Sequence, residues 1–168
     1  NKTQDGNKKI FIGGTGRSGT TILAKMLGLH SEIYTFPKEI RFITDPDGVI
    51  SLKSSLTDDW SYFQSDIAVD RFLKLMLELK GKSFWQYPTV SLSKVVGADF
   101  YDEWLNSFIS EFVQFEFKSN WVARTNIMKK IIGKIFSDRL SQPFFQNSYY
   151  CQPLSNDEFF SKANSLLS

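Results

Sequence analysis

The sequence predicts an α/β protein that is rich in helix and has a central parallel sheet flanked by helices. An apolar run, Ile10-Phe11-Ile12, leads through glycines into an amphipathic helical pattern, which is typical of a buried strand followed by a loop and a helix. Further amphipathic segments follow, so helices should outweigh strands. A length of 168 residues with 42% hydrophobic residues suits one folded domain, and no low-complexity linker divides residues 1–168.

The first strand is predicted at residues 10–13, buried in the sheet, with the glycine loop opening at its C-terminal end. The first helix then runs from Ser18 or Gly19 to about Leu29. Its expected buried face consists of the apolar residues that recur at helical spacing, namely Ile22, Leu23, Met26, Leu27 and Leu29.

The middle of the chain gives weaker signals. Residues 32–36 are a candidate short strand, and Asp45-Pro46-Asp47-Gly48 is a predicted turn whose glycine allows a positive φ. Residues 51–65 show no strong period and are interpreted as loop with some helix. Asp66 is expected to cap a helix that runs to about Lys80.

Three more helices are predicted towards the C-terminus. Asp99 is expected to cap one whose apolar face includes Trp104, Leu105, Phe108, Ile109, Phe112 and Val113. A second is expected over residues 126–136. The third follows Ser155-Asn156-Asp157-Glu158, in which a serine and a glutamate three residues apart form a capping box.

The glycine loop carries the clearest chemical signal. Glycines let the backbone approach an anion closely, and the free amides at the start of a helix point towards it. Arg17 adds a planar cation suited to phosphate or sulfate oxygens, and the paired threonines add hydroxyl donors. The residues expected to bind a phosphorylated ligand are Gly14, Thr15, Gly16, Arg17, Ser18, Gly19, Thr20 and Thr21.

The spacing disfavours a nucleoside triphosphate held with magnesium. The loop for that ligand reads G-x-x-x-x-G-K-[ST], and its lysine reaches the terminal phosphates. Gly14, Gly19 and Thr21 match this pattern, but Thr20 stands where the lysine is required. A tight turn without any ligand is the other alternative, and the arginine and paired threonines beside the glycines argue against it.

The loop resembles the 5′-phosphosulfate loop of the sulfotransferase family, which reads [RK]-S-G-T-T as Arg17 to Thr21 do. The resemblance continues through residues 30–34 into residues 37–42. There Glu39 and Arg41 match an E-x-R motif of bacterial and tyrosyl-protein sulfotransferases. Residues 121–126 are similar to the family's W-x-E-K-T-P segment, although Arg124 replaces its lysine, alanine its acidic residue and asparagine its proline.

The resemblance implies a P-loop-like fold and a sulfotransferase activity. The donor would be 3′-phosphoadenosine 5′-phosphosulfate, and the acceptor a hydroxyl or amine on a small molecule, carbohydrate or peptide. Glu39 would act as the base, while Arg41 and Arg124 would neutralise the sulfuryl oxygens during transfer. No metal is expected, because these positive groups do the work that magnesium does in kinases.

The family's site for the donor's 3′-phosphate is not matched cleanly. That site uses an arginine at the end of a second parallel strand and a serine eight residues later. Arg139 with Ser141 or Ser148 is the nearest candidate, and its spacing differs. Family domains are also longer than this chain, so a shortened or incomplete domain is one alternative.

Composition narrows the remaining classes of function. A net charge of +2 indicates neither a nucleic-acid partner nor a membrane surface, and the only cysteine, Cys151, excludes an internal disulfide. With no secretory signal or apolar run of about 20 residues, the expected location is the cytoplasm. The two competing functions are a small-molecule or nucleotide kinase and a non-catalytic nucleotide-binding module. The sequence indicates no oligomeric state and no particular acceptor.

Overall fold

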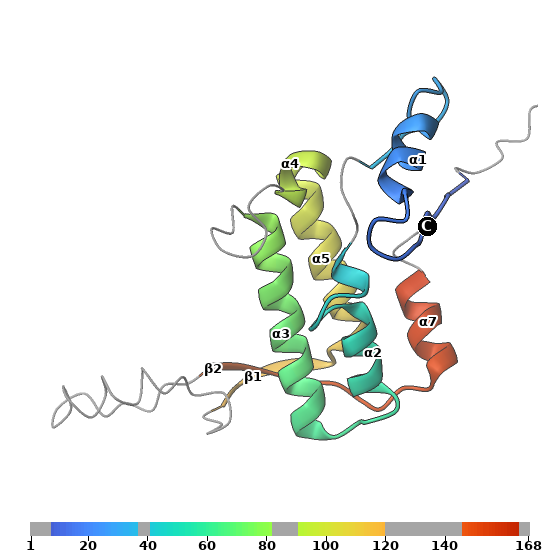
Figure 1. Cartoon of the computed structure of the whole chain (residues 1–168). Coiled ribbons are helices and arrows are strands. Elements are labelled where there is room, and N and C mark those ends of the chain that lie inside the picture. Colours follow the sequence, from blue (N-terminus) through green and yellow to red (C-terminus); the bar gives the residue numbers. More distant parts are fainter. Residues whose placement is uncertain (1–7, 37–40, 82–90, 120–145, 165–168) are drawn as a thin grey trace, which may run out of the picture. The chain divides into compact units, whose positions relative to one another are not determined.

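The computed structural model describes residues 8–36, 41–81, 91–119 and 146–164 (Figure 1). Within these residues the fold is helix-rich, with one small antiparallel sheet. The helices are α1 (Thr20–Leu27), α2 (Val49–Leu56), α3 (Tyr62–Lys80), α4 (Leu92–Val96), α5 (Ala98–Phe112) and α7 (Asn156–Asn164), with the 3₁₀ turn η1 (Arg41–Ile43). The strands are β1 (Phe115–Ser119) and β2 (Gln146–Tyr150).

The chain divides into two compact units, Asn1–Glu39 and Ile40–Ser168. The first contains the glycine loop and α1, and the second contains all the other described elements. A central parallel sheet is not seen in the described residues. Residues 8–14 are in neither helix nor strand, and the side chains of Ile10 and Phe11 are 62% and 72% exposed.

Helix α1 confirms the predicted helix but not its predicted buried face. Ile22, Leu23, Met26 and Leu29 are exposed, and no residue of α1 is buried. Helical periodicity shows that one side of a helix is apolar, but it does not supply the surface that must cover that side. The predicted strand over residues 32–36 is also absent, because residues 33–36 are in neither helix nor strand.

Helix α3 is the central element of the second unit. It begins five residues earlier than predicted, because Ser61 rather than Asp66 is its cap and accepts a hydrogen bond from the Gln64 amide at 3.1 Å. Asp66 therefore lies inside the helix, where its carboxylate is buried and accepts a hydrogen bond from the Tyr149 amide at 2.7 Å. This contact ties α3 to β2.

A chain of phenylalanine rings joins three helices and forms the core of the second unit. The ring centroid of Phe72 in α3 lies 5.3 Å from that of Phe108 in α5, and the centroid of Phe108 lies 5.0 Å from that of Phe112. Phe112 in turn stacks on Phe159 of α7 at 5.0 Å. All four rings are buried, and aromatic pairs at such distances add to the hydrophobic stabilisation. The predicted apolar face of residues 99–113 is confirmed here, although Gly97 rather than Asp99 precedes the helix as its cap.

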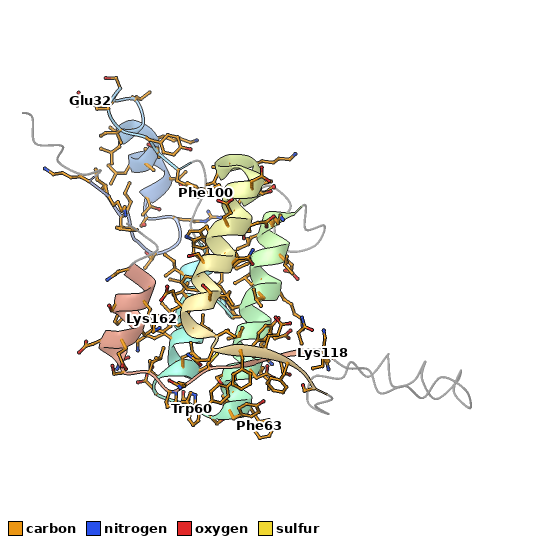
Figure 2. The ribbon with its side chains drawn as sticks, turned by 180° about the vertical axis from the view of Figure 1, so that it is seen from behind. Glu32, Trp60, Phe63, Phe100, Lys118 and Lys162 are labelled. Atoms are coloured by element: carbon orange, nitrogen blue, oxygen red, sulfur yellow. The ribbon has the colours of Figure 1, made fainter. Side chains whose placement is uncertain are left out.

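The paired strands β1 and β2 were not predicted. They pair antiparallel, with Phe115 opposite Tyr150 and Ser119 opposite Gln146, and they cross the N-terminal end of α3 (Figure 1). Trp60, which precedes α3, donates its indole N–H to the Cys151 carbonyl just after β2 at 3.1 Å (Figure 2). The alternation of apolar and polar residues in these two strands is too short for periodicity to identify them.

The last helix confirms the predicted capping box. The Glu158 carboxylate accepts from both the amide and the hydroxyl of Ser155 at 2.8 Å, and the Glu158 amide donates to the Ser155 hydroxyl at 3.2 Å. Lys162 lies one turn later and donates to the Glu111 carbonyl of α5 at 2.6 Å (Figure 2). The Lys162 contact holds α7 against α5.

Candidate functional site

The glycine loop turns sharply before α1. The Ser18 amide donates to the Thr15 carbonyl at 3.1 Å, which closes a turn. Arg17 has a φ of 63° and Gly19 a φ of 86°, so both adopt the left-handed region. Glycine does so freely, whereas a non-glycine residue there carries strain of about 1–3 kcal/mol, and such strain gathers at ligand sites.

The glycines of the loop have different structural roles. A Cβ on Gly14 would lie 2.3 Å from the Ser18 hydroxyl oxygen and 2.8 Å from the Thr20 methyl carbon, so the loop closes tightly over this residue. Gly19 is required for its positive φ. Gly16 has open space around it among the described residues, which leaves its backbone accessible.

The start of α1 is free of side-chain caps. Gly19 makes no side-chain hydrogen bond, and its carbonyl accepts from the amides of Ile22 and Leu23, both at 3.0 Å. The first amides of a helix have no partner within the helix and carry its positive dipole end. Within the described residues, no ion pair engages the exposed guanidinium of Arg17. This combination of exposed amides, hydroxyls and a cation can bind an oxyanion.

The residues expected to carry catalysis are not brought together by the structure. Glu39 and Arg124 lie outside the described residues. Arg41 begins η1, and its side chain is outside the described part. Their roles therefore stay predictions.

Of the three candidate residues for a 3′-phosphate site, the structure describes one. Arg139 and Ser141 lie outside the described residues. Ser148 is in β2 and fully buried, with its hydroxyl bonded to that of Ser119 and donating to the Asp66 carboxylate at 3.2 Å. A hydroxyl so engaged in the protein interior cannot also reach a ligand, so the position of Ser148 argues against that role.

The left-handed backbone of Arg17 is the site feature that sequence reasoning missed. The glycines on both sides indicate a tight loop, but they do not tell which residue takes the unusual φ.

Within the described ranges there is no group of three or more histidine, cysteine, aspartate or glutamate residues placed to hold a metal ion. No helix within the same ranges has the length and apolar character needed to cross a membrane.

Comparisons of the chain with known protein families, with curated proteins and with solved structures found no match. The loop and the residues around it are therefore the features of this chain that point to a function.

Proposed function

We propose that this chain is a sulfotransferase that takes its sulfuryl group from 3′-phosphoadenosine 5′-phosphosulfate. The observation that carries the proposal is the loop from Thr15 to Thr21, in which a strained arginine and an uncapped helix start face solvent together. A charge-assisted hydrogen bond from Arg17 would supply about 1.5–3 kcal/mol and the helix start about 0.3–1 kcal/mol, so Arg17 dominates anion binding.

The proposed reaction moves a sulfuryl group between two oxygens, or from oxygen to nitrogen. The acceptor atom attacks sulfur, the bond from sulfur to the phosphate oxygen breaks, and the acceptor's proton passes to a base. The loop amides and Arg17 would stabilise the negative charge that grows on the leaving phosphate. By the family resemblance, Glu39 would take the proton, and Arg41 and Arg124 would neutralise the sulfuryl oxygens.

We also propose that residues 10–13 form the central strand of a parallel sheet, as the sequence pattern predicts. The supporting observation is the apolar run of the sequence itself, since the structure has residues 8–14 in neither helix nor strand and leaves Ile10 and Phe11 exposed. Hydrogen exchange tests it, because the amides of Ile10, Phe11 and Ile12 would be strongly protected in a sheet. Exchange at the rate of an unstructured chain would contradict the proposal.

Calorimetric titration tests the anion site and separates the competing functions. Adenosine 3′,5′-bisphosphate should bind more tightly than ATP with magnesium, and Arg17→Ala should weaken its binding tenfold to a hundredfold. Lys25→Ala is the matched control, since this exposed lysine lies in the last turn of α1, away from the loop. Tighter binding of ATP with magnesium would favour a kinase, and equal binding by the Arg17 and Lys25 variants would overturn the site.

A transfer assay separates an enzyme from a binding module. Radiolabelled donor is incubated with the chain and a panel of hydroxyl and amine acceptors, and labelled product is counted. Glu39→Gln should abolish most turnover while leaving bisphosphate binding nearly intact, because glutamine keeps the shape but takes no proton. Donor binding without transfer to any acceptor would leave the binding module as the function.

A further inference from the structure

A small polar cavity lies between α2 and α3 in the second unit, and neither the loop nor its chemistry accounts for it. Its volume is about 200 Å³, below the roughly 300–1,000 Å³ of pockets that hold drug-sized molecules. Five polar side chains line it, from the turn before α2 and from both helices: Asp47, Ser51, Ser55, Gln64 and Arg71. The cavity therefore fits a ligand of about one small ring.

Helical spacing places these groups on facing sides of the two helices. Ser51 and Ser55 are four residues apart on α2, so their hydroxyls lie on one face. Gln64 and Arg71 are seven residues apart on α3, which is two turns along one face. Ala68 lies between them and forms part of an apolar wall with Ile67.

The charges on the cavity compensate each other. The Arg71 Nη1 atom lies 3.8 Å from the Asp47 Oδ1 atom, an ion pair too long for a hydrogen bond. Asp47 is held there by the turn, in which it has a φ of 65° while the Gly48 amide donates to the Asp45 carbonyl at 2.9 Å. One carboxylate and one guanidinium leave no net charge to attract an ion, and a single carboxylate is a poor metal site.

The other polar groups have hydrogen-bonding capacity to spare. Among the described residues, the structure records no hydrogen bond for the hydroxyls of Ser51 and Ser55 or for the Gln64 carboxamide. Together with Asp47 and Arg71 they offer both donors and acceptors around one space. A ligand that matches them must itself carry several groups that donate and accept.

We propose that this cavity binds a neutral, polyhydroxylated small molecule the size of one sugar ring. Vicinal hydroxyls donate to a carboxylate and accept from a guanidinium at once, which matches the loose pair of Asp47 and Arg71. The apolar wall of Ile67 and Ala68 suits the C–H face of such a ring. The proposal concerns binding alone and does not depend on the glycine loop.

Ligand-observed NMR tests the proposal on the full chain without any nucleotide. Methyl α-D-glucopyranoside and myo-inositol are the neutral probes, and glucuronate is the charged one. At least one neutral probe should bind with a dissociation constant on the order of millimolar, as expected for so small a ligand, and glucuronate should bind no more tightly. Absence of binding by both neutral probes, or tighter binding of glucuronate, would overturn the proposal.

Two variants locate the binding. Asp47→Asn keeps the size of the side chain and tolerates a positive φ, and it should weaken binding about tenfold through the lost charge. Asp58→Asn is the matched control, because Asp58 pairs with Lys53 on the exposed surface at 3.4 Å and does not line the cavity. Ala68→Leu should abolish binding by filling the space. Equal affinity in Asp47→Asn and Asp58→Asn would contradict the site, whether or not Ala68→Leu folds.

Discussion

At the scale of single residues, the turn before α2 shows how a correct motif can have an incorrect explanation. The sequence predicted a turn over residues 45–48 with a positive φ at its glycine. The turn is present, but the positive φ belongs to Asp47, while Gly48 has a φ of −80°. Gly48 is needed for space, because a Cβ there would lie 2.3 Å from the Phe42 carbonyl oxygen and 2.8 Å from that of Asp45.

Gly48→Ala should therefore destabilise the protein by about 1–3 kcal/mol, because backbone atoms must move to admit the methyl group. The midpoint of urea unfolding measures the loss. Gly81→Ala is the control, since among the described residues its Cβ would meet only the Leu77 carbonyl oxygen at an ordinary 3.7 Å and its φ of −94° suits alanine. Equal losses in the two variants would contradict the close-approach explanation.

Cys151 gives a prediction for alkaline pH. Burial, and to a lesser extent the Asp66 carboxylate, raises the pKa of its thiol from 9.0 to about 12. The folded state thus holds this proton more tightly than the unfolded state does. The stabilisation is complete below pH 9 and is lost as the pH rises towards 12, with a slope of up to about 1.4 kcal/mol per pH unit.

Unfolding of the wild type and of Cys151→Ala between pH 8 and pH 12 checks this expectation. The variant should start from a lower stability, because a buried side chain is shortened, but its stability should fall less steeply with pH. Tyr101 contributes to the remaining slope, since burial raises the pKa of its hydroxyl as well. Parallel curves for the wild type and the variant would show that the thiol does not contribute.

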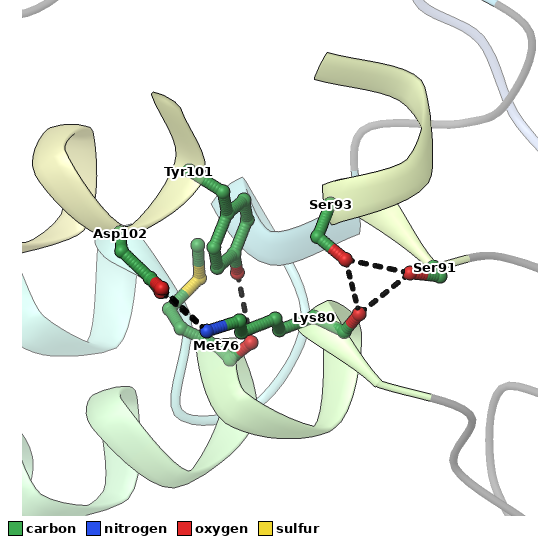
Figure 3. A network of polar contacts seen from close by, with 6 residues as sticks. All are labelled: Met76, Lys80, Ser91, Ser93, Tyr101 and Asp102. Carbon is green, nitrogen blue, oxygen red and sulfur yellow. Dashed lines mark hydrogen bonds and ion pairs between the residues drawn. The ribbon is translucent and has the colours of Figure 1, made fainter. Parts of the chain in front are cut away.

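At the scale of elements, the C-terminal end of α3 is held by two serines (Figure 3). The hydroxyls of Ser91 and Ser93 donate to the same Lys80 carbonyl, at 2.6 and 2.8 Å, just before and within α4. The Lys80 ammonium donates to both carboxylate oxygens of Asp102 on α5 at 2.6 Å. Next to it, the Tyr101 hydroxyl of α5 donates to the Met76 carbonyl of α3 at 2.8 Å. Of these carbonyls, that of Lys80 lies in the last turn of α3, where the helix itself leaves it without a partner, and the two serines satisfy it.

Because the two serine hydroxyls donate to one carbonyl, the losses of stability caused by replacing each serine should not add. Ser91→Ala or Ser93→Ala alone should cost less than about 0.5 kcal/mol, while the double variant should cost about 1–2 kcal/mol by leaving the carbonyl unsatisfied. Chemical denaturation of the four proteins gives the coupling energy directly. Additive losses would mean that each hydroxyl acts on a separate partner.

The elements also show what sequence patterns can predict. Helices α1, α3, α5 and α7 were predicted because apolar spacing and caps are local signals, and the capping box at Ser155 and Glu158 was correct in detail. The strand pair was missed because β1 pairs with a strand 27 positions away, from Ser119 to Gln146, which local patterns do not report. The loop was predicted because its residues are contiguous, whereas Glu39 and Arg124 depend on a tertiary arrangement that the described residues do not include.

At the scale of the whole molecule, the core is distributed unevenly along the chain. Every buried side chain among the described residues lies between Asp45 and Phe159, in the second unit. The described part of the first unit has none, and it exposes Ile10, Phe11, Ile22 and Met26. A segment of about 40 residues without a core is too small to be stable by itself. We therefore expect the glycine loop to unfold together with the rest of the chain, as one cooperative domain.

Hydrogen exchange with and without adenosine 3′,5′-bisphosphate tests this cooperativity. A ligand present at 100 times its dissociation constant stabilises a cooperative domain by about 2.7 kcal/mol, so exchange through global unfolding slows about a hundredfold. If the chain is one domain, the slowest amides of α3, far along the sequence from the loop, should slow by that factor. Arg17→Ala at the same ligand concentration should show a much smaller effect, because less ligand is bound. Slowing confined to residues 8–36 would mean instead that the first unit opens independently of the core formed by Phe72, Phe108 and Phe159.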